Sequence, residues 1–490
     1  MTSPEKNPLP SVNIAAPCTL RWWVFAVVLA AEVMDLLGAT VVNVAGPSLE
    51  RSLHASSVQL QWVIGGYALA MGAGLILGGR LGDKYGRRAT FLTSLSAFTV
   101  ASLLCAFAPN IAFLIGFRVL QGAAAAMLLP QGQGLLRENF DGSELSKAYG
   151  FYGPVMGLVS ILGPVLGGCL IQWDFFHLSW RLVFLADIPI GVAAWLVGMK
   201  VLPPLGGTPA LAIDSVGAAI VAGACFLFAL PLNLGQSQGW PFWTWICFAV
   251  SLAGFVLFAR QQRHVARSGG TPLVVPTVFD RTEYVVGLCG LVFFSCALVG
   301  TQLALTLFLQ IGEGFSAGRA GLWNMPMAIG TAIGATISGI VLVPRLGHRV
   351  LQLGAIVQFV GVVAIWFGLT ANGAFAVWRI TPGVFLTGLG AGLSIAALFS
   401  SILLAVGRNE IGSASGMMTA AQALSGAIGV AGFASAFFAA LHSGGVHAFR
   451  VALILETLLL AAFLIVTFFM PSKPVDAMVV EQPLPANEIN

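Results

Sequence analysis

The sequence is short of charge. Only 9% of its 490 residues are Asp, Glu, Lys or Arg, whereas 58% are apolar. A typical soluble domain has roughly 25% charged residues, so the chain has too few charges to cover a water-facing surface of this size. This shortage argues against a soluble globular protein, a disordered protein and a nucleic-acid-binding protein. The net charge of +4 is small, and the charges are spread along the chain. This distribution is more typical of loops that set the topology of a membrane protein than of a binding site for a polyanion.

The chain also lacks the motifs of metal sites and of nucleotide-driven machines. Its seven cysteines form no CxxC pair and nearly all lie in apolar runs, so we interpret them as packing residues. The six histidines include no HExxH pair, and no GxxxxGKS/T phosphate loop occurs. We therefore expect no enzyme activity, no metal and no cofactor. Uphill transport by such a chain needs an ion gradient or a separate subunit.

Long apolar runs are what the sequence does contain. A bilayer core about 30 Å thick needs roughly 20 mostly apolar residues per spanning helix. Fourteen such runs can be marked, beginning near residues 22, 58, 89, 111, 147, 180, 213, 241, 284, 318, 350, 378, 412 and 449. The first is too long and too polar for a cleaved signal peptide. The runs predict an all-α integral membrane protein with fourteen spans.

Lys and Arg are distributed unevenly over the loops between these runs. With both termini inside, 17 of the 23 fall in cytoplasmic tails and loops, five fall at outer loops, and Arg118 lies within the fourth span. Cytoplasmic loops of membrane proteins carry this kind of excess. We therefore predict a multi-pass plasma-membrane protein with an even number of spans and both termini in the cytoplasm.

Two segments repeat at a constant shift of 261 residues, Gly78–Arg88 and Gly339–Arg349. Two glycines and two basic positions of the first recur in the second: Gly78 at Gly339, Lys84 at Arg345, Gly86 at Gly347 and Arg88 at Arg349. The acid is lost, because Asp83 corresponds to Pro344. Each segment follows the second span of a six-span block, which indicates two homologous halves.

This repeat predicts the domain organisation. The expected parts are an N-terminal tail (1–21), an N-terminal six-helix bundle (22–200), two inserted spans with a linker (201–283), a C-terminal six-helix bundle (284–470) and a C-terminal tail (471–490). Parallel halves of this kind place the substrate cavity at their interface near the membrane midplane.

The chain resembles the major facilitator superfamily, and more narrowly its fourteen-span drug:proton antiporter group (EmrB/QacA type). The loop Gly78–Arg88 resembles the superfamily signature between spans two and three. The resemblance implies a conformational latch formed by Gly78, Gly82, Asp83, Gly86, Arg87 and Arg88.

Four further segments carry this resemblance. Arg118–Gly122 resembles the arginine motif of span four, whose arginine is implicated in proton coupling. A second segment resembles the antiporter motif of span five through Gly163, Pro164, Gly167 and Gly168. Asp35–Pro47 and Trp180–Gly191 resemble the signatures of spans one and six, with Asp187 where asparagine is usual.

Ionisable residues inside spans are costly and are therefore functional candidates. A rise of 1.5 Å per residue places Asp35 about 20 Å from the inner edge and Arg118 about 10 Å from the outer edge, so their depths coincide and a transient pairing is possible. Glu32 precedes Asp35 by three residues on the same helix face, and two carboxylates in one apolar cavity should not both stay ionised. We predict that Asp35, Glu32 and Arg118 couple transport to protons. The alternative for Asp35 is structural pairing, and for Glu32 it is a supporting or water-exposed acid.

Other polar residues of the spans are candidates for the substrate cavity, although each can instead bridge helices. They are Asn43, Gln61, Tyr67, Gln121, Asp187, Gln310 and Glu456. For Glu456 the alternative is a solvated or snorkelling position, and for Asp187 it is a structural bond.

These patterns together favour a proton-coupled exporter of drugs or secondary metabolites that works by alternating access. Lipophilic cations should be preferred, because carboxylates outnumber the one intramembrane arginine. An uptake permease of the same superfamily and a non-transporting sensor or assembly partner are the alternatives. The expected partners are a small hydrophobic or cationic substrate, protons and the lipid bilayer; a monomer is compatible with the sequence.

The charge distribution makes a direct prediction about topology. Reporter domains fused to either end of the chain should be active in the cytoplasm, because the Lys and Arg excess retains those ends there. A C-terminal reporter found outside the cell would contradict the even span count.

Overall fold

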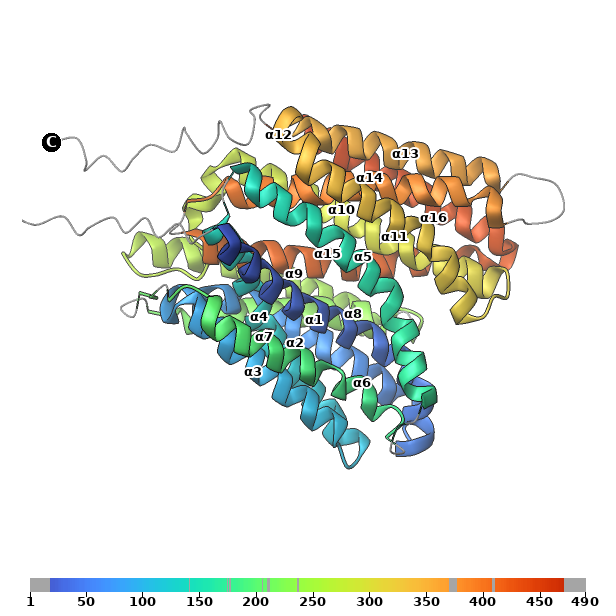
Figure 1. Ribbon diagram of the computed structural model, residues 1–490, viewed down its shortest axis with the longest axis horizontal. Coiled ribbons are helices and arrows are strands. Elements are labelled where there is room, and N and C mark those ends of the chain that lie inside the picture. Colours follow the sequence, from blue (N-terminus) through green and yellow to red (C-terminus); the bar gives the residue numbers. More distant parts are fainter. Residues whose placement is uncertain are drawn as a thin grey trace, which may run out of the picture.

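The computed structural model describes residues 18–140, 142–173, 175, 178–204, 206–208, 212–235, 238–369, 377–407 and 410–470. Every long regular element among them is a helix, and the helices run side by side in one elongated bundle (Figure 1). Helix α1 begins and helix α16 ends at the end of the bundle that carries Arg80–Arg88 and Arg345–Arg349. We call this the basic end.

The helices fall into three consecutive groups. The first contains α1 (Cys18–Leu53), α2 (Ser57–Tyr85), α3 (Arg87–Ala106), α4 (Ile111–Asn139), α5 (Gly142–Trp173), α6 (Arg181–Leu185) and α7 (Asp187–Val201). The second is the pair α8 (Ser215–Leu234) and α9 (Phe242–Arg267), followed by the 3-10 turn η3 (Pro276–Asp280). The third contains α10 (Thr282–Leu307), α11 (Ala317–Ile337), α12 (Val343–Leu346), α13 (Arg349–Gly368), α14 (Thr381–Leu404), α15 (Ile411–Ala440) and α16 (Gly445–Thr467). Helix α10 continues into a π-helical turn, η4 (Phe308–Gly312), and α11 into another, η5 (Ser338–Leu342).

Thirteen helical stretches of the described residues are long and apolar enough to cross a membrane. Helix α5 is not among them, although its 32 residues exceed the roughly 20 that a span needs. The protein is therefore a multi-pass membrane protein, as predicted, and the count of fourteen spans stays a prediction. The sixth predicted span is interrupted at Ala186, between α6 and α7.

Polar residues mark where several helices begin. Ser56 and Gln59 form a reciprocal capping box at the start of α2, and Asn110 accepts a hydrogen bond from the Phe113 amide at the start of α4. Asp214 does the same for the Gly217 amide at α8. These caps satisfy amide groups that the first helical turn leaves without partners, so they fix the point at which each apolar run enters the bundle.

Small residues let the helices approach closely. A Cβ atom at Gly78 of α2 would overlap the Ala126 carbonyl oxygen of α4, and one at Gly334 of α11 would overlap that of Leu389 on α14. Such contacts replace the hydrophobic driving force, which is weak between helices surrounded by lipid.

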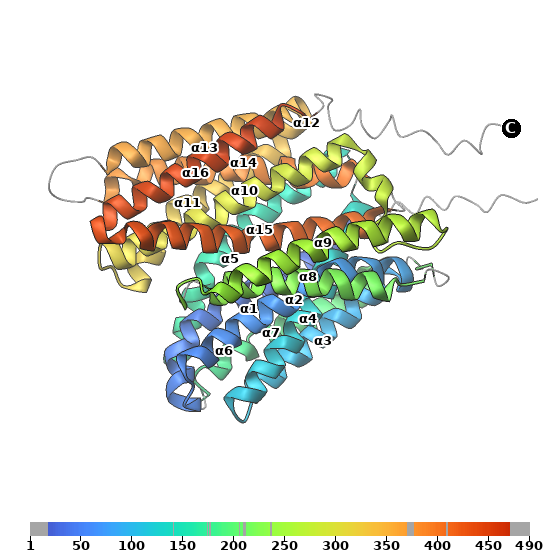
Figure 2. The same ribbon diagram turned by 180° about the vertical axis from the view of Figure 1, so that it is seen from behind.

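The first and third groups of helices lie on opposite sides of the bundle, with α5 and α15 between them. Helix α5 packs against both α1 and α11, and α15 packs against both α2 and α10 (Figure 1). The α8–α9 pair lies on the outside of this arrangement, where α8 packs against α2 and α15 (Figure 2). The functional site must therefore be sought between α1, α5, α10, α11 and α15.

The two sides touch at the basic end. The Gly79 backbone of α2 meets that of Gly412 on α15, and Arg137 Nε donates to the Leu403 carbonyl of α14 over 2.9 Å. The segment between α9 and η3 also contacts α15 here, since the Val275 amide donates to Ser413 Oγ over 3.0 Å. Several independent contacts thus close the bundle at this end.

The internal repeat is visible in the backbone. Gly86 has φ +88° and Gly347 has φ +56°, a region that favours glycine because it has no Cβ. Each amide donates to the carbonyl four residues earlier, Gly86 to Gly82 and Gly347 to Val343. The two turns therefore share a positive φ and a closing hydrogen bond as well as a sequence pattern, although ψ differs, at 136° for Gly86 and −132° for Gly347.

The contact between Gly79 and Gly412 predicts a conformational effect. The Gly79→Ala substitution should push α2 away from α15 at the basic end, because its Cβ overlaps the Gly412 carbonyl oxygen. Spin labels at the exposed Tyr85 and Leu346, in a variant without the native cysteines, should report a longer distance.

Gly72→Ala is the matched control, because a Cβ at Gly72 of the same helix meets nothing within 4 Å. Equal distance distributions for Gly79→Ala and Gly72→Ala would show that this contact does not hold the basic end closed.

Candidate functional site

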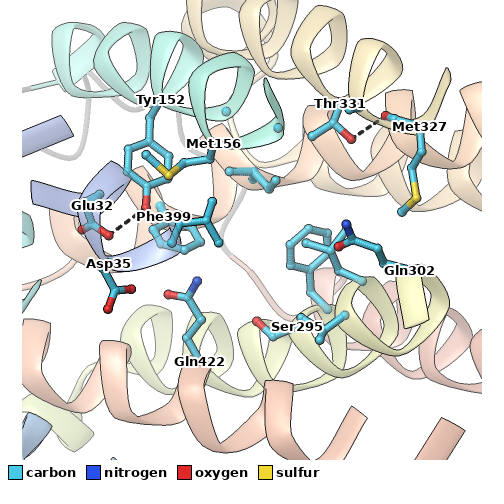
Figure 3. Close-up of a pocket in the computed structure, with 18 of the residues that line it drawn as sticks. Glu32, Asp35, Tyr152, Met156, Ser295, Gln302, Met327, Thr331, Phe399 and Gln422 are labelled. Atoms are coloured by element: carbon cyan, nitrogen blue, oxygen red, sulfur yellow. Dashed lines mark hydrogen bonds between the residues drawn. The ribbon is translucent and has the colours of Figure 1, made fainter. Parts of the chain in front are cut away.

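A cavity of about 310 Å³ lies between the two sides of the bundle. Helices α1 and α5 form one wall and α10, α11, α14 and α15 form the others. Figure 3 shows Glu32 and Asp35 on one side and Gln302, Met327 and Thr331 on the other. Its polar lining on the C-terminal side consists of uncharged groups: Ser295, Gln302, Asn324, Thr331 and Gln422.

Glu32 is held in a hydrogen-bond network of three helices. Gln133 Nε2 of α4 donates to Glu32 Oε1 over 2.9 Å, and the Tyr152 hydroxyl of α5 donates to Oε2 over 3.3 Å. The Tyr149 hydroxyl in turn donates to Gln133 Oε1. Glu32 is buried yet lines the cavity, so this carboxyl faces both the cavity and the packed interior.

Asp35 connects to Arg118 through a tyrosine. The Tyr67 hydroxyl of α2 donates to Asp35 Oδ1, and the Arg118 guanidinium of α4 lies over the Tyr67 ring, 4.2 Å from its centroid. A cation over an aromatic face is attracted by the ring quadrupole. The predicted depths thus agree with the structure, but Tyr67 lies between the two charged groups in this conformation.

A second chain of hydrogen bonds leads from Arg118 to Asp187. Arg118 Nη1 donates to Gln121 Oε1 over 2.7 Å, and Gln121 Nε2 donates to Ser102 Oγ over 2.6 Å. Ser102 Oγ donates to Asp187 Oδ2 over 3.0 Å. The guanidinium also donates to the Val63 carbonyl through Nε. Arg118 is only 1% exposed, and it therefore joins two carboxylates inside the N-terminal helices.

The charges of the cavity wall have one sign. Its described lining contains the carboxyls of Glu32 and Asp35 and no Lys, Arg or His. Apolar and aromatic groups make up most of the remaining surface, including Met156, Phe294, Leu298, Met327 and Phe399. An apolar space with a few polar groups and unbalanced negative charge suits an amphipathic ligand that carries a positive charge.

The other cavity candidates lie elsewhere. Tyr67, Gln121 and Asp187 belong to the network behind the wall, whereas Gln61 on α2 and Gln310 in the π-helical turn η4 do not line the cavity. The side chain of Asn43 lies outside the described part of the structure.

Glu456 departs from the expectation most clearly. It was predicted either at the cavity or in a solvated position, but it is 0% exposed and is absent from the cavity lining. Helix α16 packs against α10 and α13, so its inward face meets those helices and not the cavity.

The antiporter motif of span five lies within α5, where Gly163 and Gly167 are buried and Gly168 is partly buried. The side chain of Pro164 is not among the described ones. The glycines one to four turns earlier, Gly150, Gly153 and Gly157, face the backbone or methyl groups of α11. The close contact between α5 and α11 is therefore made by glycines that precede the motif in the sequence.

Several site residues were missed by sequence reasoning: Ser102, Gln133, Tyr149, Tyr152, Gln302, Asn324 and Gln422. The spacing of Tyr149 and Tyr152 offered a signal, since residues three apart share a helix face. For the amide side chains on the C-terminal side, the sequence offered no signal. Polar residues also occur on helix faces that pack against other helices and line no cavity.

The residues predicted to form a latch make a connected cluster at the basic end. Asp83 Oδ2 accepts from Arg80 Nη1 over 3.0 Å and Oδ1 accepts from Arg87 Nη2 over 2.9 Å. Arg87 Nε also donates to Glu138, and Arg88 to the Met199 carbonyl. A Cβ at Gly412, in the first turn of α15, would overlap the Asp83 carboxylate.

Glycines allow this cluster to pack. A Cβ at Gly82 would overlap the Gln131 amide, which itself donates to the Gly78 carbonyl. Asp83 thus lies against the N-terminal end of a helix from the other side of the bundle, where the helix dipole favours a negative charge.

Comparison with known proteins agrees with this architecture. The sequence matches the Major Facilitator Superfamily over residues 28–430. It is 38% identical to a probable actinorhodin transporter of Streptomyces coelicolor over 90% of this chain and 77% of that protein. It is 32% identical to a puromycin resistance protein of Streptomyces alboniger over 86% of this chain and 83% of that protein.

Solved structures share the fold at low sequence identity. The human organic anion transporter MFSD10 superimposes with a TM-score of 0.65 at 16% identity, covering 93% of this chain and all of that one. The proton:xylose symporter XylE gives 0.63 at 13% identity, covering 94% of this chain and 99% of that one. The chain therefore belongs to the Major Facilitator Superfamily, a family of membrane transporters and not of enzymes.

Proposed function

We propose that this protein is a proton-coupled exporter of drugs or secondary metabolites, an antiporter that works by alternating access. The observation that carries the proposal is the pair Glu32 and Asp35 in the wall of a cavity between the two sides of the bundle. Relatives named as a probable actinorhodin transporter and a puromycin resistance protein support export of natural products.

The two carboxyls are the proposed proton carriers. In a low-dielectric cavity they are neutralised either by protons or by a cationic substrate, because an unpaired buried charge is costly. Tyr67 links the two groups, because its hydroxyl donates to Asp35 and its ring lies under the Arg118 guanidinium. A change in the charge of Asp35 therefore alters the surroundings of Arg118. A proton and a substrate then exclude one another from the same carboxyls, and exchange is the natural mode.

Alternating access requires two halves that rock about the cavity. The proposed halves are residues 22–200 and 284–470, with 201–283 as an attached pair of helices and linker. Both termini and the basic end are proposed to be cytoplasmic, as the Lys and Arg distribution favours. Since the bundle is closed at the basic end, this conformation corresponds to the outward-facing state.

Gly78–Arg88 is the proposed latch of this state. The Asp83 carboxylate bonds Arg80 and Arg87 of its own half and lies against Gly412 of the other. Opening towards the cytoplasm has to break the contact with α15 while the contacts within the first half can persist. The latch thereby sets the balance between the two states without touching the substrate.

The coupling role of Asp35 predicts the effect of an amide. Asp35→Asn should reduce gradient-driven efflux to the level of cells without the protein, because an amide exchanges no proton, while binding of a neutral substrate persists. Efflux of a fluorescent substrate from energised cells, with and without an uncoupler, measures the first effect. Binding to the purified protein measures the second.

Asp280→Asn is a matched control for this change, because Asp280 is exposed at the end of η3, away from the cavity. If Asp35→Asn exports at the wild-type rate with unchanged pH dependence, the proton is carried by another group.

The single sign of the cavity charge predicts substrate preference. A monovalent lipophilic cation should be exported better than a matched anion, and Glu32→Gln should slow export of the cation more than that of a neutral analogue. The reason is that a buried cation needs a compensating partner. The measurement is efflux of a cation, a neutral analogue and an anion by both proteins. Equal losses for all three would assign Glu32 to coupling or structure and not to substrate choice.

A further inference from the structure

A second buried carboxyl lies outside the cavity. Glu456 occupies the middle of α16 and is 0% exposed. Its carboxyl oxygens have no hydrogen-bond partner other than the two polar side chains beside them, Thr301 and Gln358. A carboxyl in this position is unusual, because acidic residues are almost never fully buried unless they are paired with an opposite charge.

Two uncharged polar side chains share this isolation. Gln358 of α13 and Thr301 of α10 face the Glu456 carboxyl, and they are 0% and 3% exposed. Both amide atoms of Gln358 and the hydroxyl of Thr301 have no partner outside this group. Three helices thus bring five polar atoms to one place in an apolar core, where they have only one another as partners.

No ionised side chain compensates Glu456 within the described structure. Glu283 on α10 and Arg349 on α13 lie at the basic ends of their helices, and α15 contains no ionisable residue apart from hydroxyl groups. On α16 itself Arg450 lies six residues away, about 9 Å along the axis, and packs over Trp366. At the opposite end are Glu313, after η4, His442, in η8 (Leu441–Ser443), and His447, near the start of α16.

The chemistry of the group fits a neutral acid. An ionised carboxylate can accept hydrogen bonds from Gln358 Nε2 but offers nothing to Gln358 Oε1, whereas a protonated carboxyl donates to that oxygen and accepts from the nitrogen. An unpaired charge here would carry a large desolvation cost. We propose that Glu456, with Gln358 and Thr301, forms a proton-binding site in the C-terminal helices, separate from the acid pair of the cavity.

Helix α10 connects this site to the cavity. Thr301 faces Glu456 on one side of α10, while the next residue, Gln302, lines the cavity together with Ser295, Leu298 and Val299 of the same helix. Beyond them α10 passes into the π-helical turn η4, and such turns often occur at functional sites. Loss of the proton leaves a charge that α10, α13 and α16 cannot hold in this packing. The protonation state of Glu456 thereby sets the position of one cavity wall; its use in transport rests on the proposed function.

The proton itself is tested by infrared difference spectroscopy on the purified full-length protein. At neutral pH, the wild type minus Glu456→Gln spectrum should contain the C=O band of a protonated carboxyl. Gln358→Leu should shift that band, because it removes the amide partner. The exposed Glu50→Gln is the control for the same chemical change and should remove no such band.

Three outcomes would overturn the site. A carboxylate band assigned to Glu456 in the wild-type spectrum would show that the group is ionised. A protonated band that Gln358→Leu leaves unshifted would show that the carboxyl is not hydrogen-bonded to the Gln358 amide. Disappearance of the protonated band when choline is replaced by Na⁺ would show a sodium site instead. If Glu456→Gln does not fold, the shift in Gln358→Leu still decides the question.

The role in transport is tested separately. Glu456→Gln should bind substrate like the wild type but transport it with an altered pH profile, whereas Glu50→Gln should keep the wild-type profile. An unchanged profile in Glu456→Gln would refute the link through α10. Absence of efflux by the wild type would refute the proposed function and leave the spectroscopic result standing.

Discussion

The structure depends on the cost of placing a guanidinium where there is no water. Arg118 is almost fully buried, and its compensation recruits a backbone carbonyl, an amide and an aromatic ring. From these partners the hydrogen bonds continue to Asp35 on one side and Asp187 on the other. Since removal of one partner of a buried charge is strongly destabilising, the packing of α1 to α4 and α7 is tied to the state of these carboxyls.

The C-terminal helices bury far less charge than the N-terminal ones. Their contribution to the cavity is uncharged, and the carboxyl in the middle of α16, Glu456, does not line it. Close glycine contacts such as that of Gly334 with α14 hold this side together. The protein therefore pairs a charged, hydrogen-bonded wall with an adaptable amide and aromatic wall, a combination suited to ligands of varied shape.

Depth could be predicted from the sequence, whereas direction around the helix could not. Counting residues at 1.5 Å each brought Asp35 and Arg118 to one level, and the structure has them there with Tyr67 between them. The same count put Glu456 at that level, but α16 presents it to α10 and α13.

The positions of the spans were predicted well for a related reason. The bilayer imposes a minimum length on every apolar run, so composition alone marks the helices. The rotation of each helix depends instead on which small residues of its neighbours it meets, as at Gly153 of α5 against Ala335 of α11. That choice involves pairs far apart in the chain, which is why Gln302, Asn324 and Gln422 were not predicted as cavity residues.

The tyrosines have an unusual distribution. The chain has five, and three of them, Tyr67, Tyr149 and Tyr152, belong to the hydrogen-bond networks of Asp35 and Glu32. Of the others, Tyr85 is exposed and Tyr284 donates to the Ala414 carbonyl. The near-ultraviolet and Raman signals of a phenol respond to whether its hydroxyl donates to a charged or a neutral acceptor. The ring spectrum of the unlabelled protein is therefore an optical readout of how these two carboxyls are loaded during turnover.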